Sequence, residues 1–374
     1  MATVYYYSQA TGSNDGTSEA NAFTAIQTAL NSLSAGDHLY CKKHSSREGV
    51  KTTNLSMSTS SNTNNGNTII EGYETTPGDG VMYQTYSPID FTGEGVELRY
   101  IDVDADGDSS TACRLRGDGS IAYRCKFVNS YAFGNVGDFQ DSSATECYFE
   151  GTVTSSGDRV VRAYRSHFIN CTVVIGSASG SAGAAIEVSS AYRNNIVVGN
   201  LIINQDSDGP ESHVGMRITS DQAGNCLLAN NTVYNMDIGI EHVEGVRNTY
   251  STPSIFYGNI FYSVAYGIKN SQGLHSNTFG LLSIGNAFGS VTTAETSGLA
   301  MVVDSVTLTA SPFEDTTNFQ LNDTSGGGAL IKGKLGRPDL LDIESTTRTQ
   351  FQSFGAVQPT SASSSTLPTI VSFF

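Results

Sequence analysis

Residues 233–270 read VYNMDIGIEHVEGVRNTYSTPSIFYGNIFYSVAYGIKN, and this stretch contains two short phrases, each of them twice. The first phrase is an apolar residue, any residue and then a small polar residue, at 233–235 and again at 261–263. The second phrase is Gly-Ile followed by a charged and a polar residue, at 239–242 and again at 267–270. In both cases the copies lie 28 residues apart, so the two phrases share one period. A fixed period of this length predicts a repeat architecture.

Both phrases recur along the middle of the chain. The second returns at 185–188 and 215–218, and the first has a mean step of about 27 residues, with its apolar residue at Phe127, Phe149, Phe168, Ile202, Val233, Phe261 and Phe288. Two offset phrases of one period describe two faces of a coil, which buries its apolar side by stacking on the next coil about 4.8 Å away. We expect Cys125 and Cys147 to face inward, and the small polar third residues of the first phrase to form a side-chain ladder at one corner. The sequence therefore predicts an all-β chain that forms a parallel β-helix, with a β-sandwich of coincidental spacing as the alternative.

The chain divides into four segments. Residues 1–60 are expected to form an N-terminal strand and a capping helix over 22–33, because Phe23, Ile26, Leu30 and Leu33 share one helix face. Residues 61–290 are the parallel β-helix, and residues 291–359 are a C-terminal β cap, since both ends of a solenoid expose strand edges. Residues 360–374 are a Ser/Thr-rich linker and an apolar tail, which either docks on a neighbouring subunit or frays.

Composition excludes several partner classes. The 374 residues carry a net charge of −16, with a pI near 4.6, whereas nucleic-acid binders show a basic footprint and anionic membranes attract basic segments. No apolar run approaches the roughly 18 residues of a membrane span, and the opening residues lack the basic and apolar regions of a secretory signal. Six scattered cysteines disfavour a zinc site or a disulfide framework. These features favour synthesis in a reducing cytosol.

A column of charged residues is expected on the outer surface. In the second phrase the residue between two inward apolar residues faces out, and rung spacing extends this set backwards to give Arg116, Asp138, Arg162, Glu187, Arg217, Glu241 and Lys269. The signs alternate along the stack. One hypothesis is a ladder of ion pairs that fixes the register of the rungs. The other is a polar groove that binds sugar hydroxyls through Arg162, Glu187, Arg217, Glu241 and Lys269, with Tyr164 or Tyr192 as a stacking platform; catalysis on this face is a third possibility.

Paired carboxylates are the minimum for glycoside hydrolysis. The best such cluster is Asp206, Asp208 and Glu211, with His213 close by, although Gly209-Pro210 also fits an ordinary solvated turn. A lyase needs a base and a cation or Arg to stabilise the enolate. Arg217 and Lys269 qualify by residue type, but the net charge of −16 repels a polyuronate. No catalytic residue is assigned from the sequence.

Residues 102–108 imitate the first half of a calcium loop, with Asp102, Asp104 and Asp106 at alternate positions. The twelfth position is Cys113 instead of Glu, which excludes a complete EF-hand. The simpler interpretation is a strand whose Asp102 and Asp104 face outward before a turn at Asp106. Calcium at this turn is the one cofactor left open, and single histidines such as His38 and His242 are interpreted as structural groups.

Two terminal regions carry a resemblance to a known superfamily. Residues 12–23 with 35–40, and residues 311–321 with 354–358, resemble the first and last segments of right-handed parallel β-helix proteins of the pectate-lyase-like superfamily. That superfamily includes polysaccharide lyases and hydrolases, secreted bacterial surface proteins, and bacteriophage tailspikes, fibres and head decorations. Virion β-helices of this kind usually work as homotrimers.

Because the lack of a secretory signal disfavours the secreted members, the resemblance implies a bacteriophage virion protein, made in the host cytoplasm, which acts as a tail fibre, a tailspike or a head decoration. Its expected partners are two further copies of itself in a homotrimer, other virion proteins and a host-surface polysaccharide or receptor, but neither nucleic acid nor a membrane span. The alternative is a polysaccharide lyase or glycoside hydrolase, that is, a depolymerase, and a third hypothesis is a cytosolic scaffold without a ligand.

Overall fold

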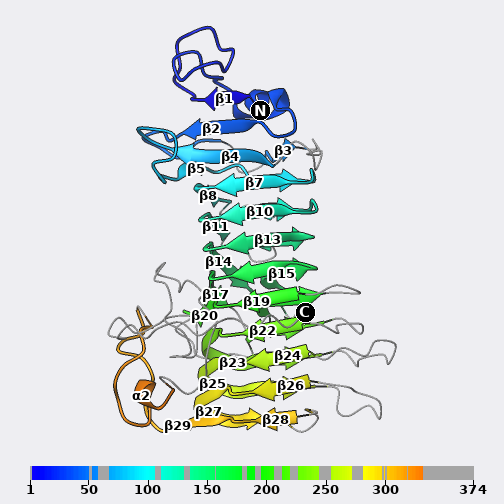
Figure 1. Cartoon of the computed structure of the whole chain (residues 1–374), viewed down its shortest axis with the longest axis vertical. Coiled ribbons are helices and arrows are strands. Elements are labelled where there is room, and N and C mark those ends of the chain that lie inside the picture. Colours follow the sequence, from blue (N-terminus) through cyan, green and yellow to red (C-terminus); the bar gives the residue numbers. More distant parts are fainter. Residues whose placement is uncertain are drawn as a thin grey trace, which may run out of the picture. The chain divides into compact units, whose positions relative to one another are not determined.

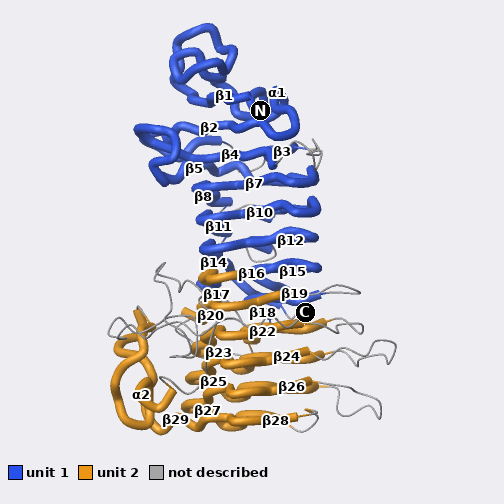
Figure 2. The backbone as a smooth tube through the Cα atoms, viewed as in Figure 1, with its two compact units in different colours: residues 1–168, 173–189 blue, residues 169–172, 190–374 orange. Residues whose placement is uncertain are grey.

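The computed structural model describes residues 2–49, 53–57, 67–105, 111–129, 135–155, 157–178, 183–189, 195–205, 213–219, 226–243, 254–271, 281–296, 299, 301–317 and 319–331. They fall into two compact units (Figure 2): unit 1 is residues 1–168 with 173–189, and unit 2 is residues 169–172 with 190–374. In each unit short parallel strands stack one above another (Figure 1). The predicted all-β parallel β-helix is confirmed, with only two helices in the described part of the chain.

Each coil of unit 1 has three faces. The first face contains β1 (Thr3–Tyr6), β2 (His38–Lys42), β4 (Thr68–Tyr73), β7 (Val96–Arg99), β10 (Ser120–Tyr123), β13 (Ser142–Thr145) and β16 (His167–Ile169). The second face contains β5 (Tyr83–Thr85), β8 (Ile101–Asp104), β11 (Lys126–Asn129), β14 (Tyr148–Val153) and β17 (Thr172–Ala178). The third contains β3 (Leu55–Met57), β6 (Ile89–Phe91), β9 (Cys113–Leu115), β12 (Gly137–Gln140), β15 (Arg159–Tyr164) and β18 (Ala184–Ser189).

Unit 2 repeats this plan with longer strands. Its first face contains β19 (Asn195–Val198), β22 (Cys226–Ala229), β24 (Ser254–Tyr257), β26 (Leu281–Ile284) and β28 (Met301–Val303). The other two faces begin as β20 (Leu201–Asn204) and β21 (Val214–Ile218) and continue as β23 (Thr232–His242), β25 (Ile260–Asn270) and β27 (Ala287–Glu295), with β29 (Val306–Leu308) and the short helix α2 (Gly328–Ile331) after them. Because β28 and β29 pair in register with β26 and β27, the coil continues beyond residue 290. The predicted boundaries of the caps stay predictions.

Alternation of side chains fills the interior of each coil. On β7, Val96 and Leu98 point inward and are fully buried, whereas Glu97 and Arg99 face outward. Inward aromatic rings stack from rung to rung, as in Phe261 over Phe288, whose centroids are 5.3 Å apart. The first phrase of the sequence is thus a column of core residues, and Ile202, Val233, Phe261 and Phe288 are confirmed as neighbours in register.

The prediction that Phe168 belongs to this column is wrong. It lies on β16 of the first face, whereas the strand next to β14 on the second face is β17. The triplet Phe-x-Asn at 168–170 matches the repeated phrase but lies on the first face, one face before the expected position. Coil lengths vary, so its distance along the chain did not reveal the difference. Phe168 is nevertheless buried, and its ring contacts those of Phe139 and Phe149.

The main polar ladder lies at a different place from the predicted one. It is formed by the residue two positions before the apolar residue of the first phrase, at Asn200, Asn231, Asn259 and Asn286 in unit 2. Each ladder residue follows a corner residue of positive φ, such as Asn230 (60°) or Gly258 (60°). Cys125 and Cys147 hold the equivalent position in unit 1 and, as predicted, face inward. The predicted column contains one such bond, from Asn235 Nδ2 to the carbonyl oxygen of Asn204 on the preceding rung at 3.0 Å. Its members Asn235, Ser263 and Ser290 have φ values of 52–58° and bend β23, β25 and β27 between two faces.

The capping helix is shorter than predicted. Helix α1 covers Ile26–Ser32 instead of 22–33, because the backbone of Phe23 pairs with that of Tyr6 as a β-bridge. The apolar face of α1 is retained, with Leu30 buried. Within the described residues, neither helix has the length and apolar character that crossing a bilayer demands.

Candidate saccharide-binding site

The predicted charged column is present on the third face of unit 1. Residues in register along it are Asp90, Arg114, Asp138, Arg162 and Glu187, so acidic and basic residues alternate on successive rungs. Arg114, and not the predicted Arg116, lies opposite Asp138. Arg116 is two residues further along the chain and reaches back to Asp138, with Nη2 2.7 Å from Oδ2.

The contacts of this column are ion pairs whose N···O distances differ. Arg114 Nη1 lies 3.4 Å from Asp90 Oδ2. Glu187 accepts two hydrogen bonds from Arg159 Nη1, at 2.9 and 3.0 Å, whereas Arg162 Nε lies 4.0 Å away. The principal partner of Glu187 is therefore Arg159, which the sequence reasoning did not select because it is three residues from the predicted Arg162.

Unit 2 contains the remaining members of the column. Arg217, Glu241 and Lys269 are in register on β21, β23 and β25. Glu241 lies between the two cations, 3.2 Å from Arg217 Nε and 3.9 Å from Lys269 Nζ. Arg217 is only 8% exposed, so its pair with Glu241 is largely shielded from solvent. Nearby, burial raises the pKa of Asp237, although the positive charge of Lys269 acts to lower it.

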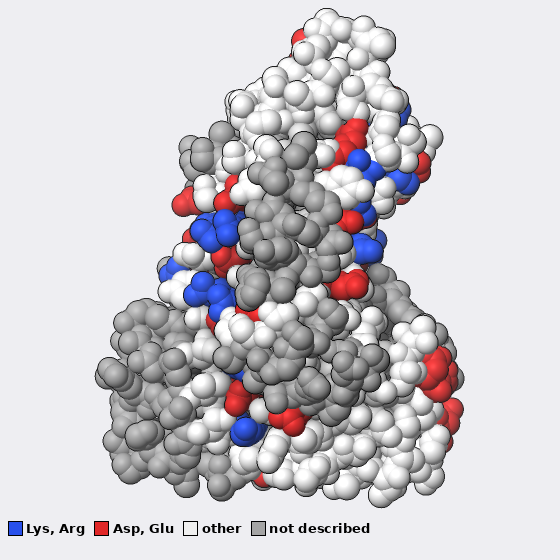
Figure 3. Space-filling model, turned by 180° about the vertical axis from the view of Figure 1, so that it is seen from behind, with Lys and Arg blue, Asp and Glu red and all other residues white. Residues whose placement is uncertain are grey.

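These contacts favour a structural role for the column. Asp90, Asp138, Glu187 and Glu241 each have a basic partner within 4.0 Å, and in Figure 3 basic and acidic side chains alternate in small groups. Alternation penalises a slip of one rung, because a slip would bring like charges together. We therefore place the candidate binding site elsewhere.

The other predicted acidic sites have separate outcomes. Asp102 is 4% exposed and forms a two-pronged ion pair with Arg47, at 3.0 and 2.9 Å, while Asp104 lies 3.8 Å from Arg47 Nε. Arg47 thus supplies a positive charge beside Asp102 and Asp104, the first two acidic residues of the predicted calcium loop. Asp106, Asp206, Asp208, Glu211 and Tyr192 lie outside the described residues. Among the residues that the structure does describe, no three His, Cys, Asp or Glu side chains gather closely enough to hold a metal ion.

A second outward column, which we call the tyrosine column, crosses the first face of unit 1. It consists of residues in register on five successive strands, Tyr5, Tyr40, Glu71, Arg99 and Tyr123. The three tyrosines are partly exposed. At about 4.8 Å per rung the column is about 19 Å long, which is enough for several units of a linear polymer.

Charged contacts fix the centre of the tyrosine column. Glu71 is 5% exposed, and its Oε2 lies 3.1 Å from His38 Nε2 and 3.8 Å from Arg99 Nη1. Arg99 Nε also donates a 2.7 Å hydrogen bond to Glu97. The ring of Tyr40 lies over that of His38 with 4.0 Å between centroids, and Tyr5 follows at 5.7 Å from Tyr40. Two aromatic rings, two charged groups and a third aromatic ring thus follow one another along one line.

The environment sets the protonation of His38. Burial lowers its pKa, and the carboxylate of Glu71 opposes this effect without overcoming it. Burial and Glu71 together raise the pKa of Tyr40, so its hydroxyl keeps its proton at neutral pH. The hydroxyl of Tyr40 therefore remains available as a hydrogen-bond donor.

Sequence reasoning missed the tyrosine column and interpreted His38 as an isolated structural residue. His38 is not isolated, because it contacts Glu71 of the next coil, but its structural role stays a prediction; Glu71 and Arg99 lie 33 and 61 residues further along the chain. The sequence signal for the column is the outward alternation in 38–40, 69–73 and 97–99, which precedes the first copy of the repeated phrase at Phe127. Aligning the first-face strands would have found it.

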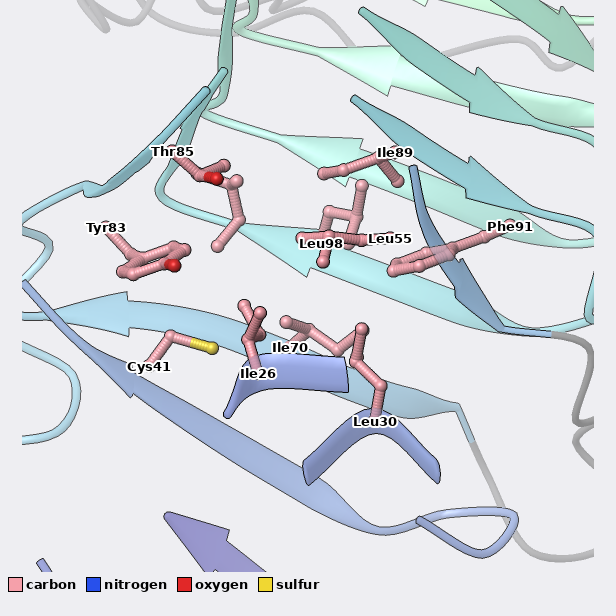
Figure 4. Close-up of a pocket in the computed structure, with 11 residues that line it drawn as sticks. Ile26, Leu30, Cys41, Leu55, Ile70, Tyr83, Thr85, Ile89, Phe91 and Leu98 are labelled. Carbon is pink, nitrogen blue, oxygen red and sulfur yellow. The ribbon is translucent and has the colours of Figure 1, made fainter. Parts of the chain in front are cut away.

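A small cavity in unit 1 lies beneath α1 and is almost wholly apolar (Figure 4). Ile26 and Leu30 of the helix point into it, opposite Cys41, Ile70 and Leu98 of the first-face strands. Ligand sites normally combine an apolar lining with several converging polar groups. This cavity is therefore assigned to the packing of the cap, and not to ligand binding.

Comparison with known proteins identifies the fold alone. No protein-family model and no curated protein matches the sequence. The structure of pectate lyase Pel9A is similar over 96% of this chain and 97% of that chain, with a TM-score of 0.62 and 13% identity. A rhamnogalacturonan lyase (TM-score 0.46, 13% identity, 81% and 84% covered) and a PL6 alginate lyase in complex with a trisaccharide (0.40, 10%, 89% and 88%) follow at lower similarity. The chain is a parallel β-helix, the fold that it shares with polysaccharide lyases.

Proposed function

We propose that this chain is a bacteriophage virion protein (a tail fibre, a tailspike or a head decoration) that binds a host-surface polysaccharide as a homotrimer. The observation that carries the binding function is the tyrosine column. Three partly exposed tyrosines there flank the buried Glu71 and its partly exposed partner Arg99 on one line of rungs.

This column suits a saccharide for two physical reasons. A sugar ring presents C–H groups on its faces, and these pack against the apolar face of a tyrosine ring while the hydroxyl stays hydrated. Sugar hydroxyls at the ring edge need hydrogen-bond donors and acceptors that are held in place. Glu71, His38 and Arg99 already contact one another, so little side-chain conformational entropy is lost when they bind a sugar. A line of such groups fits a linear polymer better than a small compact ligand.

Binding is favoured over cleavage by the partners of the acidic groups. Hydrolysis needs one carboxyl that donates a proton and a second that acts as base or nucleophile. Glu71, Asp138, Glu187 and Glu241 instead each contact an arginine, so the partner of each carboxylate is a cation and not a second carboxyl group. The lyase or hydrolase hypothesis becomes one outcome of the test below.

The virion assignment rests on the resemblance of residues 12–23, 35–40, 311–321 and 354–358 to the pectate-lyase-like superfamily, one group of which consists of bacteriophage proteins. A stacked ladder of backbone hydrogen bonds also makes a stiff projection that suits the outside of a particle. Mass spectrometry of purified phage particles should find this chain among the structural proteins. Its absence from particles of a phage that encodes it would contradict the assignment.

The binding test uses the full chain and a panel of purified bacterial capsular and O-antigen polysaccharides. We expect one polysaccharide to bind, and Tyr40→Ala to raise its Kd about tenfold, because the sugar loses about 1.4 kcal/mol of stacking energy. The matched control is Ser143→Ala, also outward on the first face, which should leave Kd unchanged. The proposal would be contradicted if none of the polysaccharides bound or if both variants had equal effects on Kd. Release of new reducing ends or of unsaturated uronate would favour the depolymerase hypothesis instead.

A further inference from the structure

The first face of unit 2 differs from that of unit 1 in having an apolar outer surface. Side chains on its strands point alternately inward and outward, and Val197, Leu228 and Phe256 are among the buried inward ones. The residues before them in the sequence face outward and form one column in register, which contains Ile196, Leu227, Ile255, Leu282 and Met301. On five successive rungs the outward side chain is therefore a large aliphatic one.

A second outward column runs beside the first. Its last three members, Tyr257, Ile284 and Val303, are also apolar and partly exposed. Met301 is 43% exposed, which makes it one of the two exposed large hydrophobic residues in the described chain. We call these eight side chains the apolar face.

The apolar face contains no ionisable group except the hydroxyl of Tyr257. The corresponding surface of unit 1 holds His38, Glu71, Glu97 and Arg99 on three successive strands. An uncharged aliphatic surface offers nothing to a polysaccharide or to a nucleic acid. Contiguous apolar patches of this kind mark protein–protein contacts in soluble proteins.

We propose that the apolar face is where copies of this chain pack against one another. This inference rests on the homotrimer of the proposed function and assigns it a surface. A chain of net charge −16 repels its own copies at long range, and this face brings no further like charges together at the contact. Another copy of the chain offers the same uncharged aliphatic surface in return.

The two columns also suit a cyclic arrangement. In a ring of three, each copy meets one neighbour on either side, so the contact is heterologous and uses two different surfaces. Side chains two residues apart on a strand lie roughly 7 Å apart, which allows the column of Leu282 to meet one neighbour and that of Ile284 to meet the other. At about 4.8 Å per rung the contact extends about 19 Å along the stack.

The test compares the full chain with Leu282→Glu and with the matched control Ser143→Glu, which places the same charge on the first face of unit 1. Light scattering after size exclusion should give three times the 39.6 kDa chain mass for the full chain and for Ser143→Glu. Leu282→Glu should give the mass of one chain, because each contact would bury an unpaired carboxylate. Circular dichroism and thermal unfolding then establish that the variant chain is folded.

Three outcomes would overturn the inference: a full chain of single-chain mass, a Leu282→Glu variant that remains trimeric, or a folded Ser143→Glu variant that dissociates equally. A chain truncated after residue 359 tests the competing occupant, its own apolar tail. If the full chain is monomeric and truncation increases hydrophobic-dye binding, then the tail covers this face. Polysaccharide binding is measured separately on each variant, so loss of the trimer and failure of the proposed binding function are distinguishable.

Discussion

Single glycines permit the close stacking of aromatic residues in unit 2. A Cβ atom on Gly239 would lie 2.3 Å from Cδ1 of Phe261 and 2.5 Å from the carbonyl oxygen of Gly267. Gly267 meets the ring of Phe288 on the next rung in the same way. The glycine that opens the second phrase of the sequence is therefore required by the aromatic residue of the first phrase.

We expect Gly239→Ala to lower the free energy of unfolding by about 2 kcal/mol, because the methyl group must displace a ring and a backbone carbonyl in a close-packed interior. Urea denaturation measures this change. Gly157→Ala is the matched control, since its Cβ would meet only Ser155 Oγ, at 4.0 Å. Equal losses in the two variants would mean that glycine flexibility, and not space, sets the cost.

At the level of elements, the coils of unit 2 are joined by the asparagine ladder. Asn259 Nδ2 donates to the carbonyl of Leu228 and to Oδ1 of Asn286, both at 2.9 Å. Its own Oδ1 accepts from the backbone N–H and the Nδ2 of Asn231, at 2.9 and 3.0 Å. One buried amide therefore satisfies polar groups on three rungs, and no single strand could satisfy them alone.

Asn259→Ala should lower the free energy of unfolding by about 2–4 kcal/mol, because it leaves several buried donors and acceptors without partners. The exposed Asn31 on α1 provides the control, and Asn31→Ala should cost at most about 0.5 kcal/mol. Equilibrium urea unfolding reports both values. A loss below about 1 kcal/mol for Asn259→Ala would show that water replaces the missing amide.

At the scale of the whole molecule, buried histidines make the free energy of unfolding depend on pH. Burial lowers the pKa of His242, which is 3% exposed, although the nearby side chain of Asn270 acts in the opposite direction. Burial also lowers the pKa of His38. In the unfolded chain both side chains return to a pKa of about 6.5.

The free energy of unfolding should therefore fall as pH is lowered through about 6.5. Below that value the unfolded chain binds protons that the folded chain still excludes, so acid favours unfolding. Urea unfolding at a series of pH values from about 8 to about 5 measures the slope. The slope should be smaller in His242→Gln, and an unchanged slope in that variant would refute this role for His242.

The sequence was sufficient for the architecture, because a parallel β-helix repeats one local pattern. Val233, Phe261 and Phe288 could be aligned from their period alone, and the alternation of Arg217, Glu241 and Lys269 on the outer surface followed from it. Each of these statements needs only the order of residues within a coil and the fact that coils stack.

Only the tertiary structure decided which side chains meet across coils. Coil length varies from rung to rung, so distance along the chain does not give the register, and Phe168 was placed on the wrong face for that reason. The same variation hid the contacts of Glu71 with His38 and Arg99, and that of Glu187 with Arg159. Backbone hydrogen bonds between stacked strands set the register, and only that register brings these residues together.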